Sequence, residues 1–315
     1  MSGHTLSGTD TEGDGKAVPE NPNAKIVDPY LKQKRTVNWN QELIESQVGL
    51  VLGVGGVGST VAMNLVRMGF RKVFLIDRDI VDDHNLNRQI LYKKEHVGKP
   101  KVFCAAEALQ AHNYRTELVP LHIDAVAQWQ QVVQCARQST CVFNGIDFGD
   151  YWDYAVSSLC RKLGIPHALG GTDPITGHAV FYDFFAERHG PCALCLAEPK
   201  HREVLARILP EHILDLPTLH GIIPKDDQYR KGGSVVWACG AGADIMVGMV
   251  IDHILHMETV TGRPTPTRIF FNMLSWELEK YTLEPLQTCE FCRQTQSGAF
   301  VPPADTAPAV NPLPK

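Results

Sequence analysis

The stretch that decides the fold is Gly53-Val54-Gly55-Gly56-Val57-Gly58, because it separates two segments of different periodicity. Before it, residues 47–52 form a short apolar run, which predicts a buried parallel strand. After it, residues 59–68 predict a helix that Gly69 ends. Glycine permits a tight turn and close approach of backbone N–H groups to phosphate, and the helix adds its positive dipole end. We therefore expect a phosphate-binding turn here, the alternative being a glycine-rich turn without a ligand.

The alternation of strands and helices continues along the chain. Further strands are predicted at 72–76, 117–121, 139–144 and 166–169, and helices at 101–111 and 151–163. An antiparallel pattern follows at 178–185, then a long apolar helix at 241–257 and a late strand at 268–272. This order predicts an α/β fold: a Rossmann-like, doubly wound, mostly parallel sheet with an antiparallel C-terminal extension. In such a sheet, ligands bind at the carboxyl ends of the strands.

Composition predicts one domain between two tails. The chain has 315 residues, 44% of them apolar and 21% charged, which suits a globular protein with a sizeable core. Residues 1–25 are polar and 297–315 are rich in proline and alanine, so we expect disordered tails around a single domain, 26–296. The net charge of -5 argues against nucleic acid as the main partner. Without a long apolar run or a targeting signal, we expect no membrane span and a cytoplasmic location.

A second, polar signature distinguishes this chain from a dehydrogenase. Asp77 ends the second strand, where a carboxylate accepts hydrogen bonds from the ribose hydroxyls of a nucleotide. Arg88 and Lys101 supply cations and Asp147 supplies a ligand for magnesium near the same strand ends. Attack of a carboxylate on the α-phosphate of ATP builds negative charge, and cations set in place stabilise that transition state more than the ground state. The alternative for either cation is a solvated surface charge.

The combination resembles a known family. Four segments carry the resemblance together: Gly53 to Gly58, Asp77 to Asp79, Asn85 to Gln89 and Gly98 to Lys101. Through them the chain resembles the ThiF/MoeB/HesA family of the ubiquitin-activating (adenylating) enzyme superfamily. The resemblance extends from about Val48 to Cys292 and implies ATP-dependent adenylation of the C-terminal carboxylate of a ubiquitin-like or sulfur-carrier protein, with release of pyrophosphate. It also implies a homodimer and the use of ATP and Mg²⁺. The implied nucleotide-binding residues are Gly53, Gly55, Gly56, Gly58, Asp77, Asp79, Asn85, Asn87, Arg88, Gln89, Lys101 and Asp147, of which Arg88, Lys101 and Asp147 are the catalytic ones.

Cysteine spacing predicts a metal site. The nine cysteines are an odd number in a long chain, which does not suit a disulfide scaffold. Two C-x-x-C pairs, Cys192/Cys195 and Cys289/Cys292, match the ligand set of a tetrahedral Zn²⁺ site, with free thiols or a redox pair as the alternatives. Similar pairs hold a structural zinc in the family.

Three departures from the family pattern bear on mechanism. Phe148 stands where the family has an amide after the acidic residue, and Tyr30 to Arg35 is a poor match for the segment that supplies an arginine to a partner subunit. The segment from Leu196 to Trp237 lacks the cysteine that other members place near Ser234. Cys239 is the remaining candidate nucleophile, and we expect it instead to be a small buried thiol packed beside glycine.

Other functions remain open at this point. The same chemistry suits a peptide terminus or a tRNA-borne carboxylate, as in the dehydratase branch of the family, although the acidic charge argues against tRNA. A non-catalytic partner of an activating enzyme is a further alternative, against which Arg88, Lys101 and Asp147 argue. A nicotinamide-dependent oxidoreductase ranks last.

Overall fold

A single mixed sheet organises the protein. The computed structural model describes residues 28–113, 115–184, 191–196, 213–222, 233–286 and 289, so both expected tails lie outside the described residues. The eight strands lie in the order β3-β2-β1-β4-β5-β6-β7-β8. Their bounds are β1 Val48–Leu52, β2 Lys72–Asp77, β3 Glu117–His122, β4 Cys141–Asn144, β5 His167–Asp173, β6 Thr176–Tyr182, β7 Arg268–Asn272 and β8 Glu277–Tyr281.

The first five strands are parallel and the last three extend the sheet in antiparallel pairs. β1 lies between β2 and β4 and pairs with both in parallel, and β5 pairs in parallel with β4. From β5 onward, each neighbouring pair is antiparallel. All five residues of β1 are buried, as expected for a strand covered on both faces. The predicted architecture, a mostly parallel sheet with an antiparallel C-terminal extension, is therefore confirmed.

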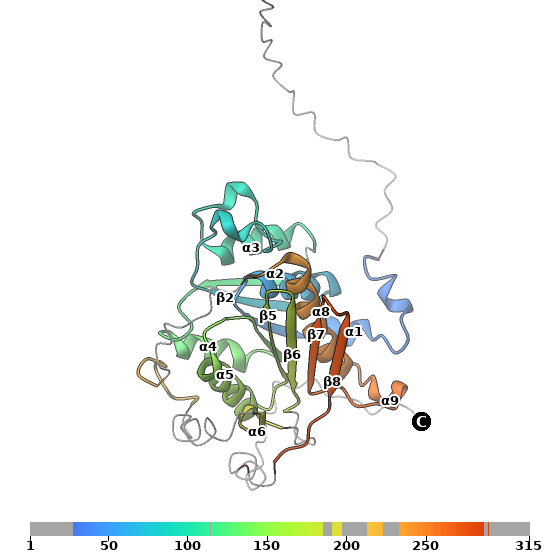
Figure 1. Cartoon of the computed structure of the whole chain (residues 1–315). Helices are drawn as coiled ribbons and strands as arrows, with labels where there is room; N and C mark the ends of the chain where they lie inside the picture. The colour runs from blue at the N-terminus through green and yellow to red at the C-terminus, as the bar shows by residue number, and fades with distance from the viewer. Residues whose placement is uncertain are drawn as a thin grey trace, which may run out of the picture.

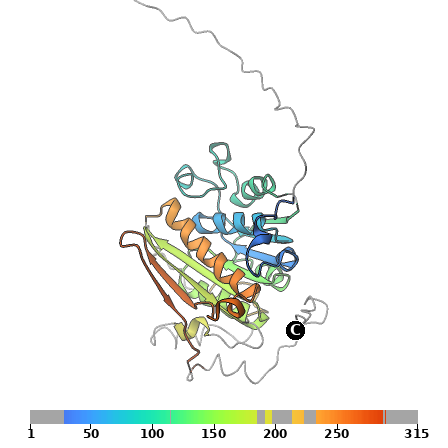
Figure 2. The same cartoon turned by 90° about the vertical axis from the view of Figure 1, so that its right-hand side faces the viewer.

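Helices cover both faces of the sheet. One hydrophobic core joins the sheet to α2 (Gly56–Met68), α3 (Lys101–Gln110) and α8 (Val236–Ile254). The other core joins it to α4 (Trp129–Arg137), α5 (Asp150–Leu163) and α6 (Ala193–Leu196). Short helices α1 (Gln41–Ser46) and α9 (Glu258–Thr261) complete the described helical turns, with 3-10 turns at Gln33–Arg35, Asp83–Asn85 and Lys94–His96. The layers are visible in Figure 1, and Figure 2 shows α2 and α8 side by side across one face.

Several predicted boundaries were wrong, for reasons of packing. Helix α2 begins at Gly56 rather than at residue 59, and α8 begins at Val236 rather than at residue 241. Gly240 and Gly242 therefore lie inside a helix, where the sequence suggested a turn. A Cβ at Gly242 would stand 3.6 Å from the ring of Phe271, an ordinary contact, so α8 packs against β7 at this position without requiring a glycine.

Several elements were not predicted at all, among them α1, α4, α6, α9 and β8. Helix α4 is short, although its buried residues Trp129, Val132, Val133 and Ala136 follow helical spacing. Helix α1 has six residues, with an N-cap in which the Asn40 side chain accepts a hydrogen bond from the Leu43 N–H. Strand β8 is exposed at every residue, so it has no buried face to produce a strand pattern. Within the described ranges, no helix combines the length and apolar character that crossing a membrane requires.

Candidate nucleotide-binding site

The glycine turn between β1 and α2 is so tight that no side chain fits at Gly53, Gly56 or Gly58 without a shift of its neighbours. Gly53 has φ of +82°, and its N–H donates to the carbonyl of Ile76 at 2.7 Å. A Cβ at Gly58 would lie 1.8 Å from the carbonyl oxygen of Gly53. Helix α2 therefore rises directly from the end of the strand, and its N-terminus points to the carboxyl edge of the sheet. This is the geometry in which backbone N–H groups and the helix dipole bind phosphate.

The first residue of α2 packs against Cys239 in α8. A Cβ at Gly56 would lie 2.7 Å from the Cys239 Sγ atom. This thiol is 2% exposed and lies 3.0 Å from the Ser234 hydroxyl, with the Thr172 hydroxyl at 3.8 Å. The expected turn around Cys239 is thus a helical turn, and its thiol is a packing group against the nucleotide loop.

Asp77 holds the loops at the end of β2. Its two carboxylate oxygens accept the N–H groups of Val54 at 2.9 Å and Asp79 at 2.8 Å. Burial raises the pKa of this carboxyl, which the positive charge of Lys101 opposes. The Tyr92 hydroxyl donates to the Val54 carbonyl at 2.6 Å and fixes the turn from the other side. Tyr92 was not among the predicted site residues, since nothing in its position separates it from a core tyrosine.

Two cations lie beside this turn. The Lys101 ammonium is 2.9 Å from the Asp79 carboxylate, and its side chain is only 6% exposed. The Arg88 side chain passes beside the turn, with Cγ 3.7 Å from the position of a Cβ at Gly56. Its guanidinium donates to the His84 carbonyl at 2.8 Å and to the Asn87 side chain at 2.9 Å. Both cations are therefore fixed in direction before any ligand binds.

The two predicted amides have different surroundings. Asn85 is buried and its side-chain oxygen accepts the Asp82 N–H at 2.9 Å, so it shapes the loop. The Gln89 amide nitrogen lies 3.8 Å from the position of a Cβ at Gly55. The side-chain carbonyl oxygen of Gln89 is buried and has no hydrogen-bond partner among the residues that the structure describes. A buried acceptor without a partner next to a phosphate-type loop fits a site that a nucleotide completes.

Asp147 lies in the loop between β4 and α5, which touches the glycine turn. A Cβ at Gly53 would stand 3.0 Å from the carbonyl of Gly145, two residues before this exposed carboxylate. Asn144 anchors the loop: its oxygen accepts from the Trp152 indole at 2.9 Å, and its amide donates to Asp153 at 2.7 Å. Burial, together with the charges of Asp150 and Asp147, raises the pKa of the Asp153 carboxyl.

The structure thus brings most predicted nucleotide residues to one edge of the sheet. The contacts above link the glycine turn to Asp77, Asp79, Arg88, Gln89 and Lys101. Asn85 and Asn87 accept hydrogen bonds within the loop that carries Arg88. Asp147 lies in the neighbouring loop. The segment 30–35 lies elsewhere: Gln33 donates to the carbonyl of Met68 at the far end of α2.

Three of the four predicted metal ligands form a cluster. Cys192 Sγ lies 3.8 Å from that of Cys195 and 3.7 Å from that of Cys289, although Cys192 and Cys289 are 97 residues apart. Cys192 and Cys289 are 1% and 2% exposed. The Leu286 N–H donates to the Cys195 sulfur at 3.4 Å, a contact that stabilises a thiolate. The group is able to ligate a metal ion, and Cys292 lies outside the described residues.

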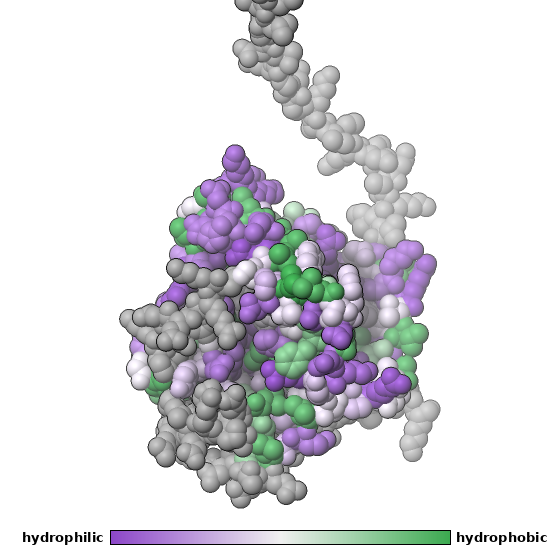
Figure 3. Space-filling view, in the orientation of Figure 1, coloured by the Kyte–Doolittle hydropathy of each residue, from purple (hydrophilic) through white to green (hydrophobic). Residues whose placement is uncertain are grey.

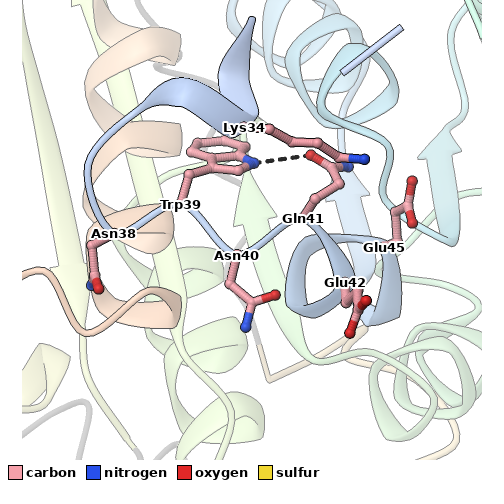
Figure 4. Close-up of a pocket in the computed structure, with 7 residues that line it drawn as sticks. All are labelled: Lys34, Asn38, Trp39, Asn40, Gln41, Glu42 and Glu45. Atoms are coloured by element: carbon pink, nitrogen blue, oxygen red, sulfur yellow. Dashed lines mark hydrogen bonds between the residues drawn. The ribbon is translucent and has the colours of Figure 1, made fainter. Parts of the chain in front are cut away.

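A separate hollow lies next to α1, the helix that leads into the amino end of β1 (Figure 4). It is formed by residues between Lys34 and Glu45, around the start of α1. The Trp39 indole donates to the Gln41 side chain at 2.9 Å along its wall. Because α1 precedes the amino end of β1, this hollow is remote from the glycine turn and is not the nucleotide site.

Comparison with known proteins agrees with this arrangement. A family model described as the ThiF family matches residues 31–292. SUMO-activating enzyme subunit 2 of Dictyostelium discoideum is 33% identical over 123 residues, which are 39% of this chain and 18% of that protein. The adenylyltransferase and sulfurtransferase MOCS3 of Arabidopsis thaliana is 30% identical over 160 residues, 51% of this chain and 33% of that protein. The matched segments therefore span a third or less of these relatives.

Solved structures share the fold. The crystal structure of E. coli MccB with ATP superposes with a TM-score of 0.62 at 17% identity, covering 80% of this chain and 68% of that one. PaaA superposes with a TM-score of 0.61 at 18% identity, covering 87% of this chain and 78% of that one.

Proposed function

Since this chain belongs to the ThiF family, we propose that it adenylates the C-terminal carboxylate of a ubiquitin-like or sulfur-carrier protein, using ATP and releasing pyrophosphate. The observation that carries the proposal is the placement of Arg88 and Lys101 beside the glycine turn and Asp77. A glycine turn and an acidic residue suit any dinucleotide. Fixed cations next to them suit a reaction that develops charge on phosphate oxygens.

The chemistry follows from these positions. A carboxylate oxygen of the substrate attacks the α-phosphorus, the new P–O bond forms the acyl-adenylate, and the bond to the β-phosphate breaks to release pyrophosphate. The N–H groups at the start of α2 bind phosphate oxygens, and Arg88 and Lys101 neutralise the charge that moves onto the pyrophosphate. Asp77 orients the ribose and thereby the α-phosphate.

Asp147 is the residue that would hold magnesium. A hard divalent cation takes oxygen ligands, and this exposed carboxylate lies in a loop that also has Asp150 at its end. Magnesium bound there supplies positive charge to the phosphates and uses few protein ligands. The Asn144 contacts to Trp152 and Asp153 keep this loop in place without it.

The carboxyl edge also suits a macromolecular substrate. Trp237 at the start of α8 is 47% exposed, and Leu274 and Trp276 in the β7–β8 turn are 74% and 81% exposed. The Met273 N–H donates to the Ile175 carbonyl at 3.2 Å, which joins that turn to the β5–β6 turn at this edge. Figure 3 shows hydrophobic residues over the region where Figure 1 places the upper end of α8. Exposed apolar groups beside a site are typical of protein docking, and relatives include a SUMO-activating enzyme subunit.

A structural zinc ion fits the cysteine cluster. Four thiolates at a Zn–S distance of about 2.3 Å around a tetrahedral centre lie about 3.8 Å apart. The Sγ separations of 3.7 and 3.8 Å in the cluster match that spacing. Cys292 is the natural fourth ligand by its spacing from Cys289. Zinc bound here ties the segment after β6 to the segment after β8.

The first test is ligand preference and exchange. We expect MgATP, not NAD, to raise the thermal unfolding temperature. ATP at one hundred times its Kd adds about 2.7 kcal/mol to the free energy of unfolding. ATP–pyrophosphate exchange with a panel of ubiquitin-like and sulfur-carrier proteins then identifies the substrate, and a peptide ending in the same residues tests the peptide alternative. Stabilisation by NAD without any by MgATP would refute the proposal.

The second test removes charges from the site. Asp147→Ala and Arg88→Ala should each lower the exchange rate by an amount equivalent to about 2.7–4 kcal/mol of barrier, with the fold intact. Arg67→Ala, an arginine in the last turn of α2 at the far edge, is the matched control and should exchange like the wild type. Wild-type exchange in either site variant would place the chemistry elsewhere.

A further inference from the structure

Arg78 is an exposed cation that two other loops hold in a fixed orientation. It follows Asp77 at the end of β2, and its side chain is 56% exposed. Its Nη1 atom donates to the Asp124 carboxylate at 2.7 Å, and its guanidinium carbon lies 5.9 Å from the centre of the Phe148 ring. Its backbone carbonyl is 2.8 Å from the His122 Nε2 atom. The loops after β2, β3 and β4 therefore meet at this side chain.

The anchor of Arg78 is itself rigid. One oxygen of Asp124 accepts the N–H groups of Val126 at 2.9 Å and Ala127 at 3.1 Å, and the other accepts from Arg78. An exposed ion pair contributes little to stability because ordering the side chains offsets the attraction. An arginine that is ordered by a fixed carboxylate and an aromatic ring, yet more than half exposed, is instead a preformed planar surface.

Its place relative to the nucleotide loop indicates what this surface contacts. In the proposed nucleotide complex, the phosphates lie at the glycine turn after β1 and the ribose at Asp77, at the end of β2. In that arrangement the base extends from the ribose away from the phosphates, and Arg78, which follows Asp77 in the chain, lies next to the ribose position. Guanidinium groups stack on aromatic faces, where dispersion and cation–π attraction act together.

We propose that Arg78, held by Asp124 and Phe148, stacks on the adenine base of ATP and gives the site its preference for a purine. The inference rests on the proposed function, because it needs a nucleotide bound through the glycine turn and Asp77. Phe148 is also the residue that departs from the family pattern, so this pairing is a property of this chain.

The test separates the base from the phosphates. Arg78→Lys keeps the charge and a partner for Asp124 but removes the planar group, and binding is measured with ATP, CTP and inorganic tripolyphosphate. We expect ATP to bind about tenfold more weakly, a change of about 1.4 kcal/mol, while tripolyphosphate binds as before. The preference for ATP over CTP should shrink accordingly.

A matched control uses a second arginine with the same kinds of contact. Arg115 lies 5.4 Å from the ring of Tyr30 and 3.7 Å from the Glu45 carboxylate, away from the carboxyl edge. Arg115→Lys should leave all three affinities unchanged. Phe148→Leu should weaken ATP binding, and the double variant with Arg78→Lys should be no weaker than Arg78→Lys alone, because Phe148 acts through Arg78.

Each outcome decides something different. If wild-type protein binds ATP but Arg78→Lys binds it equally well, the stacking inference is overturned and the proposed function stands. If Arg78→Lys loses tripolyphosphate and ATP in equal measure, Arg78 is a phosphate ligand and the inference is again overturned. If wild-type protein binds no ATP, the proposed function fails and this inference fails with it.

Discussion

The contact between Gly56 and Cys239 gives the sharpest prediction, because one substitution creates a clash that a second one removes. A Cβ at Gly56 would lie 2.7 Å from the Cys239 Sγ atom, whereas ordinary contact begins at 3.4 Å, so α2 and α8 would have to separate by about 0.7 Å (3.4 − 2.7). Such overpacking costs about 1–3 kcal/mol, which outweighs the gain of up to about 1 kcal/mol from replacing glycine with alanine in a helix.

Removal of the sulfur should relieve the strain. In a Cys239→Ala background, the nearest remaining atom is the Cβ of residue 239 at 3.5 Å, which is an ordinary contact. We therefore expect Gly56→Ala to lower the unfolding temperature by several degrees, at about 2–4 °C for each kcal/mol. The same substitution in Cys239→Ala should cost almost nothing. ATP–pyrophosphate exchange should follow the same pattern, since Gly56 lies in the phosphate turn.

The measurement is a double-mutant cycle by thermal unfolding and by exchange. Gly58→Ala serves as the control, because its Cβ would lie 1.8 Å from a backbone oxygen that no side-chain substitution removes. Cys239→Ala should therefore not rescue it. If the cost of Gly56→Ala is the same with and without the sulfur, the thiol is not the obstacle and the packing argument is wrong.

Three further predictions follow from other parts of the protein. Metal analysis should find one zinc ion per chain, and Cys289→Ser should lose it and lower stability while ATP still binds; purified protein without zinc would contradict this. Burial lowers the pKa of His167 to about 3. Below about pH 6.5 the unfolded chain therefore binds a proton at this imidazole that the folded chain does not bind. The free energy of unfolding falls as the pH drops from 6.5 towards 3. His167→Phe should remove about 2 kcal/mol of that loss at about pH 5, measured as the difference in unfolding free energy between about pH 5 and about pH 8; an equal pH dependence in both proteins would exclude this assignment. Cys239→Ser should keep exchange and product formation, and a thiol-sensitive adduct with the carrier that disappears in this variant would show that the thiol is a nucleophile.

Local pattern was enough for the parallel half of the sheet. Each parallel strand there is a short run bounded by glycine or a polar residue, and the glycine turn sits between β1 and its helix as the sequence predicts. The polar residues Asp77, Arg88 and Lys101 could be selected because strand ends of a parallel sheet meet at one edge. Strand β8 was missed because it is exposed at every residue, so its sequence does not alternate between apolar and polar residues.

Contacts between distant segments were decided only by the tertiary structure. The sequence shows two C-x-x-C pairs, but the fold places Cys192 within 3.7 Å of Cys289 across 97 residues. It also shows glycines at 240 and 242, but not that α8 begins before them, at Val236. The burial of one face of a helix or strand appears in the sequence as a regular spacing of apolar residues, because it depends on residues close together in the chain. The meeting of Cys239 with Gly56, or of Arg78 with Phe148, depends on how whole elements pack, and no local pattern records it.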